Sequence, residues 1–153
     1  MSWWIAESEH TLAQEVPAPP DRVRNFYVDL DNIKLVHPLI VSVTAESRRE
    51  TSDGYLQSYR VVDRIPFGPF TMKITYRARL QVPAHGDVTT EADQSPGVRL
   101  RGRVSFEPIE TGTRVTERIR VVAPRPLASV TTREAVKAHI AMLAGICRHF
   151  ESA

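Results

Sequence analysis

The sequence predicts an α+β protein in which a seven-stranded antiparallel curved sheet wraps around a long C-terminal helix. Short alternating segments are separated by evenly spaced glycines, which is typical of a meander of six strands. These glycines are Gly54, Gly68, Gly86, Gly97 and Gly112. A strand and two short helical segments precede the meander, and one long amphipathic helix follows it. This order predicts a sheet that grips a helix and encloses a cavity.

The first strand is expected over Ser8–Val16, where the two faces alternate in character. Prolines end this strand, and Pro20 followed by Asp21 suits the start of a helix, because proline lacks only a donor that the first turn does not use. A buried stripe then follows at helical spacing and comprises Val23, Phe26, Tyr27 and Leu30. A second short helix is expected over Asp31–Val36. It must end near His37, because Pro38 disfavours the helical conformation in the residue before it.

The six strands of the meander are predicted over Leu39–Arg48, Gly54–Asp63, Phe70–Val82, Asp87–Asp93, Val98–Phe106 and Thr113–Val122. Asp53-Gly54 is a favoured hairpin dipeptide. Between Phe70 and Val82 every even position is apolar or aromatic, so this strand has one buried face and one wet face. We expect Phe70, Met72, Ile74, Tyr76 and Leu80 to face the long helix.

The last segment, Pro126–Ser152, predicts a helix of about 40 Å at 1.5 Å per residue. A helical wheel gives one apolar seam, with His139 on its flank. The seam comprises Val136, Ile140, Leu143, Cys147 and Phe150, and the opposite side comprises Glu134, Ala138, Gly145 and His149. A helix this long and one-sided is expected to lie across the concave face of the sheet.

Composition limits the class of protein. The 153 residues fit one domain, 1–153. The net charge of +2 argues against a nucleic-acid binder. Cys147 is the only cysteine, which excludes an intrachain disulfide and a thiolate metal cluster. The sequence has no signal-peptide pattern and no apolar run long enough for a transmembrane segment, so we expect a cytoplasmic protein. Phosphate-binding loops and histidine metal motifs are absent from the sequence, which predicts neither a cofactor nor a metal.

Three segments resemble a known superfamily. Val16–Val23, with Phe26 and Asp29, resembles the superfamily's entry into its first helix, and Asn32–Pro38 resembles its second helix and exit. The hairpin from Tyr59 to Ala78, through Ile65-Pro66-Phe67-Gly68-Pro69, is similar to those of its polyketide cyclase/dehydrase-like branch. On these segments and on the order of elements, the chain is identified as a member of the START-like (SRPBCC, Bet v 1-like) superfamily, which has the helix-grip fold.

The resemblance implies a cavity between the sheet and the long helix. Members of the superfamily typically bind hydrophobic ligands there, and some cyclise, dehydrate or hydroxylate them. The chain lacks the cysteine and histidine ligands of the iron-sulfur oxygenase relatives, which argues against that branch.

Polar side chains that point into such a cavity are candidates for function, because they orient ligands when they are paired. His139 could donate a hydrogen bond to a ligand or act as acid or base; alternatively, it bonds a backbone carbonyl at the edge of the core. Glu117 shares its face with Val115 and Ile119. A buried carboxylate there could be a general acid, or it could pair with an inward arginine or lie near an open rim.

Four further residues complete the predicted ligand site. Tyr76 and Tyr59 lie on predicted inward faces, where their phenols could orient a carbonyl or simply pack with satisfied hydroxyls. His37 could line the entrance or be a surface or hinge histidine. Leu143 lies in the helix seam and is expected to limit the cavity. His10 also falls on an inward face.

Charges alternate in sign between neighbouring strands on the predicted outer face. Cross-strand ion pairs explain this pattern, and the alternative is an arginine-rich surface that meets an acidic protein or an anionic lipid. The arginines on the last two strands are Arg99, Arg101, Arg103, Arg114, Arg118 and Arg120.

Three functional hypotheses remain open at this stage. The first is binding or carriage of a medium-sized hydrophobic small molecule, lipid- or polyketide-like, by a monomer or homodimer. The second is a cyclase or dehydratase that uses His139, Glu117 and a tyrosine for acid-base chemistry. The third is an interaction module that uses the arginine-rich sheet face. The lack of a recognisable catalytic set favours the first hypothesis over an enzyme.

Overall fold

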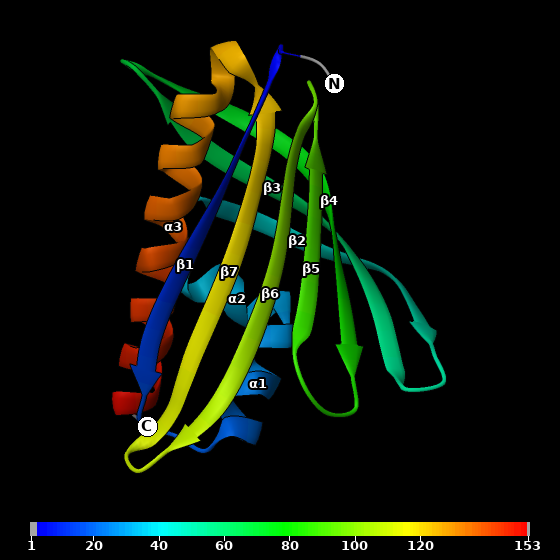
Figure 1. Cartoon of the computed structure of the whole chain (residues 1–153), viewed down its shortest axis with the longest axis vertical. Coiled ribbons are helices and arrows are strands. Elements are labelled where there is room, and N and C mark those ends of the chain that lie inside the picture. Colours follow the sequence, from blue (N-terminus) through cyan, green and yellow to red (C-terminus); the bar gives the residue numbers. More distant parts are fainter. Residues whose placement is uncertain (1–2, 153) are drawn as a thin grey trace.

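The computed structural model describes residues 3–152 and contains one seven-stranded sheet and three helices within that range (Figure 1). The elements in chain order are β1 (Ile5–Val16), α1 (Pro20–Val28), α2 (Leu30–Val36), β2 (Ile40–Glu50), β3 (Gly54–Phe67), β4 (Phe70–Pro83), β5 (Val88–Gln94), β6 (Val98–Ile109), β7 (Gly112–Pro124) and α3 (Arg125–Glu151). The predicted fold class is confirmed. No helix within residues 3–152 has the length and apolar character that a membrane span requires.

All neighbouring strands are antiparallel, in the order β1-β7-β6-β5-β4-β3-β2. The chain enters at one edge through β1, crosses to the other edge through α1 and α2, and returns strand by strand to β7. Register shifts in β2 after Ile40 and after Ala45 interrupt its pairing with β3, and such bulges bend a strand. Four of the predicted turn glycines, Gly68, Gly86, Gly97 and Gly112, have the positive φ that disfavours any other residue.

The two short helices are separated at Asp29 rather than after Leu30. Asp29 accepts a hydrogen bond from the Asp31 backbone N–H at 3.0 Å and so caps α2. Leu30 therefore begins α2 instead of ending α1, although it remains buried as expected.

The β3–β4 hairpin is longer than predicted. Pairing continues from Ile65 opposite Met72 to Phe67 opposite Phe70, so β3 extends beyond its predicted end at Asp63. The alternation along β4 is as predicted, with Ala78, Leu80 and Val82 buried. Phe70 and Met72 have the predicted parity but are not buried, because their side chains are 72% and 45% exposed. Met72 lines the same cavity as residues of α3, so it lies on the predicted face without being covered.

The apolar seam of α3 also differs from the prediction. Ala138 and Gly145, which were placed on the opposite side, are buried, whereas Ile140 is exposed. The buried arc is rotated by about a quarter of a turn, because α3 packs on β1 and β7 with one side and against α2 with another. A Cβ atom on Gly145 would lie 2.9 Å from Val36 Cβ, so only glycine lets α2 approach α3 this closely.

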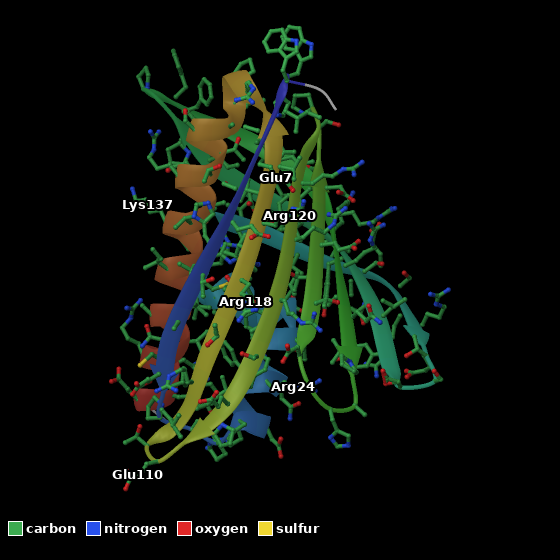
Figure 2. The ribbon with its side chains drawn as sticks, viewed as in Figure 1. Glu7, Arg24, Glu110, Arg118, Arg120 and Lys137 are labelled. Atoms are coloured by element: carbon green, nitrogen blue, oxygen red, sulfur yellow. The ribbon has the colours of Figure 1, made fainter. Side chains whose placement is uncertain are left out.

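The outer face of the sheet carries the predicted cross-strand ion pairs. Arg79 contacts Glu91 at 2.8 Å, and Arg103 contacts Asp87 at 3.0 Å. Arg120 of β7 pairs with Glu7 of β1, and Figure 2 shows these two side chains on the same face as Arg118. Each exposed pair contributes only tenths of a kcal/mol, so the pattern serves mainly to fix strand neighbours.

Two aspartate substitutions test the extent of the covered sheet. Val61 of β3 is fully buried and Met72 of β4 is half exposed. We expect Val61→Asp to lower the free energy of unfolding by more than about 3 kcal/mol, because it buries an unpaired charge, and Met72→Asp to lower it by less than about 1 kcal/mol. Urea unfolding of both variants gives the comparison. Equal losses would mean that α3 covers the hairpin after all.

Candidate functional site

A cavity of about 240 Å³ lies between the inner face of the sheet, α2 and the N-terminal half of α3. It exists because α3 packs chiefly on β1 and β7 and leaves the inner faces of β3 to β5 without a covering helix. Most of its wall is apolar, with Ile33, Ile74, Leu80, Leu100 and Met142 among the lining residues. Because Phe67 and Met72 line the cavity and are also exposed, the cavity opens to solvent at the β3–β4 hairpin.

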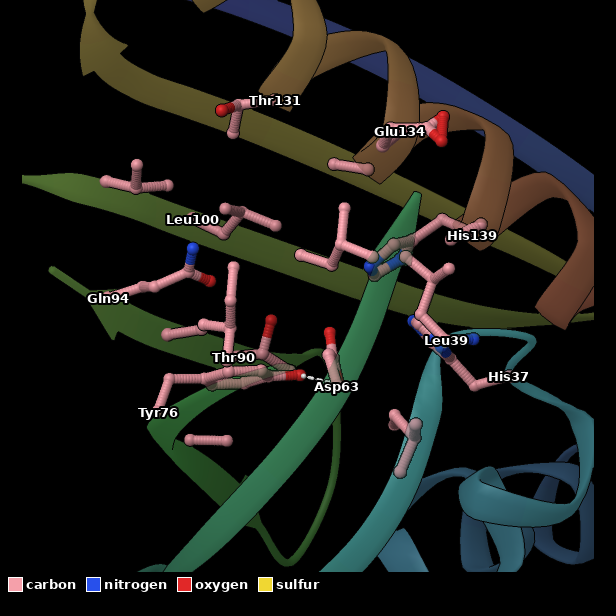
Figure 3. Close-up of a pocket in the computed structure, with 18 of the residues that line it drawn as sticks. His37, Leu39, Asp63, Tyr76, Thr90, Gln94, Leu100, Thr131, Glu134 and His139 are labelled. Atoms are coloured by element: carbon pink, nitrogen blue, oxygen red, sulfur yellow. Dashed lines mark hydrogen bonds between the residues drawn. The ribbon is translucent and has the colours of Figure 1, made fainter. Parts of the chain in front are cut away.

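Polar side chains enter this apolar wall from two sides. His37 and His139 lie together near α2 and α3, and Asp63 and Tyr76 project from β3 and β4 (Figure 3). Thr90 lies beside the latter pair. A ligand in this cavity would therefore be surrounded by hydrocarbon and would meet hydrogen-bonding groups at defined points.

Behind His139 lies a buried three-residue network. His139 Nδ1–H donates to Glu117 Oε1 at 2.5 Å, and the Tyr27 hydroxyl donates to Glu117 Oε2. Glu117 is 1% exposed, so both carboxylate oxygens are satisfied by side chains inside the core. The network joins α1, β7 and α3, which are far apart in the sequence.

The network favours the charged form of both partners. Burial alone would raise the pKa of the Glu117 carboxyl, but the positive charge of His139 and the hydrogen bonds from His139 and Tyr27 together bring this pKa below its ordinary value. Burial alone would lower the pKa of His139, and the Glu117 carboxylate outweighs burial and raises it. Burial, and then the negative charge of Glu117, raise the pKa of Tyr27, which stays a hydrogen-bond donor.

His37 is held in the opposite protonation state. Burial, and next the positive charge of His139, lower the pKa of His37 to about 3. The His37 and His139 rings meet edge to face, with 5.6 Å between their centroids. The Leu39 backbone N–H donates to His37 Nδ1 at 3.2 Å, which assigns the remaining proton of this neutral ring to Nε2. The cavity wall thus contains a neutral imidazole beside an imidazolium.

The strand side of the cavity carries a second titratable group. Asp63 is 6% exposed and accepts a hydrogen bond from the Tyr76 hydroxyl at 3.2 Å. Burial raises the pKa of Asp63 to about 6, although the Tyr76 hydrogen bond and the positive charge of His139 both act to lower it. The pKa of Tyr76 is raised by burial and by Asp63. Asp63 can therefore exchange a proton near neutral pH, whereas the raised pKa of His139 favours its protonated form.

The predicted site residues fall into three groups. His37, Tyr76 and His139 line the cavity, and Glu117 lies behind His139 as its partner. Tyr59 is buried, with its hydroxyl 3.4 Å from the Val28 carbonyl oxygen, and Leu143 is buried in the core; neither belongs to the cavity wall.

Asp63 and Tyr27 are polar residues of the site that were not predicted. Asp63 shares the inward parity of Tyr59 and Val61, so strand alternation contained the signal. Tyr27 lay in the predicted buried stripe of the first helix, but the sequence did not indicate that its hydroxyl bonds Glu117. Within residues 3–152, no cluster of three or more histidine, cysteine or acidic side chains is suited to hold a metal ion.

Comparison with known protein families gives a match over residues 8–148 to the family described as "Polyketide cyclase / dehydrase and lipid transport". The chain belongs to this family. The resemblance to the START-like superfamily is thereby confirmed. A search of curated proteins gives no significant match.

Solved structures share the fold at low sequence identity. The di-domain ARO/CYC BexL from the BE-7585A biosynthetic pathway has a TM-score of 0.72 and 22% identity over 95% of this chain, which matches 50% of that chain. The Zhui aromatase/cyclase from Streptomyces sp. R1128 has a TM-score of 0.70 and 16% identity, covering 96% and 94% of the two chains. A START superfamily protein from Mycobacterium smegmatis has a TM-score of 0.68 and 15% identity, covering 94% and 97%.

The stability of the buried network should depend on pH. His139→Gln keeps a hydrogen-bonding side chain but removes the positive charge. The contribution of Glu117 is present above its ordinary pKa of 4.5 and lost as pH falls through its lowered pKa. The contribution of His139 is complete below its ordinary pKa of 6.5 and lost as pH rises through its raised pKa.

We therefore expect His139→Gln to lower the free energy of unfolding most, by about 1–3 kcal/mol, in the window between these ordinary values, and progressively less as pH rises through the raised pKa of His139. Urea unfolding over a pH series measures this difference. The exposed His149, on the same helix, supplies the control variant His149→Gln. A difference that stays constant with pH would contradict the charged pair.

Proposed function

We propose that the protein binds and carries a medium-sized hydrophobic small molecule, lipid- or polyketide-like, in the cavity between the sheet and α3. The observation that carries this proposal is a cavity of about 240 Å³ with a mostly apolar wall, into which His37 and His139 project as a pair. Membership of a family described as polyketide cyclase / dehydrase and lipid transport supports the same ligand class.

The polar groups indicate which end of the ligand is recognised. The imidazolium of His139 has one N–H directed to Glu117 and a second N–H left to donate. Neutral His37 has its Nε2–H as a donor. Two ring donors in one wall suit an oxygen that accepts hydrogen bonds, such as a carbonyl. We propose that this oxygen of the ligand lies toward the two histidines, while its hydrocarbon part contacts the sheet.

A second candidate function is a cyclase or dehydratase acting on a polyketide-like substrate. The observation that favours it is the pair of groups across the cavity, Asp63 with a pKa raised to about 6 and His139 with a raised pKa, which suit a proton acceptor and a proton donor. Two proteins with this fold are described as aromatase/cyclases. Loss of water from a bound substrate would establish this function, whereas release of the ligand unchanged supports carriage.

A pair of phenylalanine variants tests ligand binding. Ala135 lines the cavity and Ile140 is an exposed residue of the same helix. Wild type should bind a solvatochromic apolar dye with one-to-one stoichiometry, and we expect Ala135→Phe to weaken this binding about tenfold or more, because its ring fills part of the cavity. Ile140→Phe should leave the affinity unchanged.

Native mass spectrometry of the purified wild type provides an independent test, since a retained small molecule would appear as added mass. Absence of dye binding by the folded protein, or equal loss in the two phenylalanine variants, would count against the cavity as the binding site. Thermal melting of each variant verifies that it is folded.

A further inference from the structure

Exposed large apolar side chains occur on the hairpin at the cavity mouth and at the start of β1. On the β3–β4 hairpin, Phe67, Phe70 and Met72 are 44%, 72% and 45% exposed. At the start of β1, Trp3 and Trp4 are 70% and 58% exposed and stack with 4.5 Å between ring centroids. Exposed side chains of this size in one region mark an interaction surface more often than scattered single residues do.

These two groups lie at the same end of the molecule. The hairpin tip, the start of β1 and the first turn of α3 are all at the top of Figure 1. The Arg125 backbone N–H donates to the Trp4 carbonyl oxygen at 2.5 Å, which ties the start of β1 to the start of α3. Leu127, two residues after Arg125 in α3, lines the cavity. Phe67 and Met72 of the hairpin line the same cavity.

Two segments at this end, the β3–β4 hairpin and the start of α3, are basic. No acidic residue occurs between Asp63 and Asp87, a segment that includes Arg64 and Lys73 directly opposite each other on the hairpin. None occurs between Glu117 and Glu134, a segment that includes Arg125 and Arg133. Three acids, Asp63, Glu91 and Glu134, line the cavity. This differs from the outer face of β4 to β6, where arginines alternate with acids and form ion pairs.

We propose that this end of the protein docks on an anionic lipid bilayer, with the cavity mouth facing the membrane. Tryptophan side chains favour the interface between headgroups and hydrocarbon, phenylalanine and methionine side chains enter the acyl region, and arginine and lysine attract anionic headgroups. The tip of the hairpin would reach the acyl chains at the point where the cavity opens. Membrane docking goes beyond the proposed ligand binding. It does not depend on a ligand in the cavity.

The chain contains its own reporter for this surface, because Trp3 and Trp4 are its only tryptophans. Mixed with vesicles of equimolar phosphatidylcholine and phosphatidylglycerol, wild type should show tryptophan emission at shorter wavelength and quenching by lipids with brominated acyl chains. Binding should weaken with added salt and should be much weaker on vesicles of phosphatidylcholine alone.

Matched substitutions separate this surface from other exposed apolar residues. Phe70 on the hairpin and Leu35 on α2 are 72% and 73% exposed. We expect Phe70→Ser to lower the vesicle partition coefficient about tenfold or more, because a phenyl group leaves the acyl region, and Leu35→Ser to leave it unchanged. The double variant Arg64→Gln with Lys73→Gln should reduce binding to anionic vesicles.

Several outcomes would overturn the proposal. Tryptophan emission that does not respond to anionic vesicles is one, and equal losses in Phe70→Ser and Leu35→Ser are another. A wild-type dimer that Phe70→Ser converts to monomer, with no vesicle binding, would assign the surface to a second copy of the chain. The cavity variant Ala135→Phe, which adds no tryptophan, should still bind vesicles, so failure of docking and failure of ligand binding are distinguished.

Discussion

The buried carboxylate of Glu117 is the constraint on which the site depends. A charge with 1% exposure in an apolar core is tolerated only when it is fully hydrogen-bonded and paired. Tyr27 from α1 and His139 from α3 supply these partners, so three elements must meet at one point of β7. Removing either partner would leave a buried charge short of a hydrogen bond, and the resulting cost fixes the positions of both helices relative to the sheet.

The same arrangement sets the electrostatics of the cavity. Because His139 carries a positive charge, it lowers the pKa of neighbouring His37 and also acts to lower the pKa of Asp63 across the cavity. Burial is the larger effect on Asp63, whose pKa is raised to about 6. Burial and the ion pair therefore together set which groups in the wall are charged, with burial the larger effect on His37 and Asp63.

Much of this architecture could be predicted from the sequence, because strand alternation and turn glycines are local properties. The parity of β3, β4 and β7 was correct, and so was the alternation of charge on the outer face. Which part of a strand or helix is covered by another element depends on tertiary packing, so the local sequence pattern does not predict it. Met72 has the parity of a core residue but is half exposed, because it lines an open cavity instead of packing in the core. Gly145 has the position of a solvent-facing residue and is buried because α2 packs there.

The polar site was predicted only in part, because which side chains meet is also decided by tertiary packing. His139 and Glu117 were each recognisable as polar residues on apolar faces, but a sequence does not specify that the two meet, nor that Tyr27 completes the set. Asp63 could have been found from its inward parity on β3. Leu143 and Tyr59, in contrast, were expected at the ligand site and lie in the packed core, since their distance from the cavity depends on the rotation of α3 and on the path of α1.

The charged state of His139 is tested most directly by NMR titration of its imidazole nitrogen and carbon shifts in wild type and in Glu117→Gln. If the buried ion pair exists, His139 titrates above its ordinary pKa of 6.5 in wild type, and its pKa falls when Glu117 loses its charge. A wild-type His139 that titrates at or below 6.5, or one that does not respond to Glu117→Gln in a folded protein, would contradict the account.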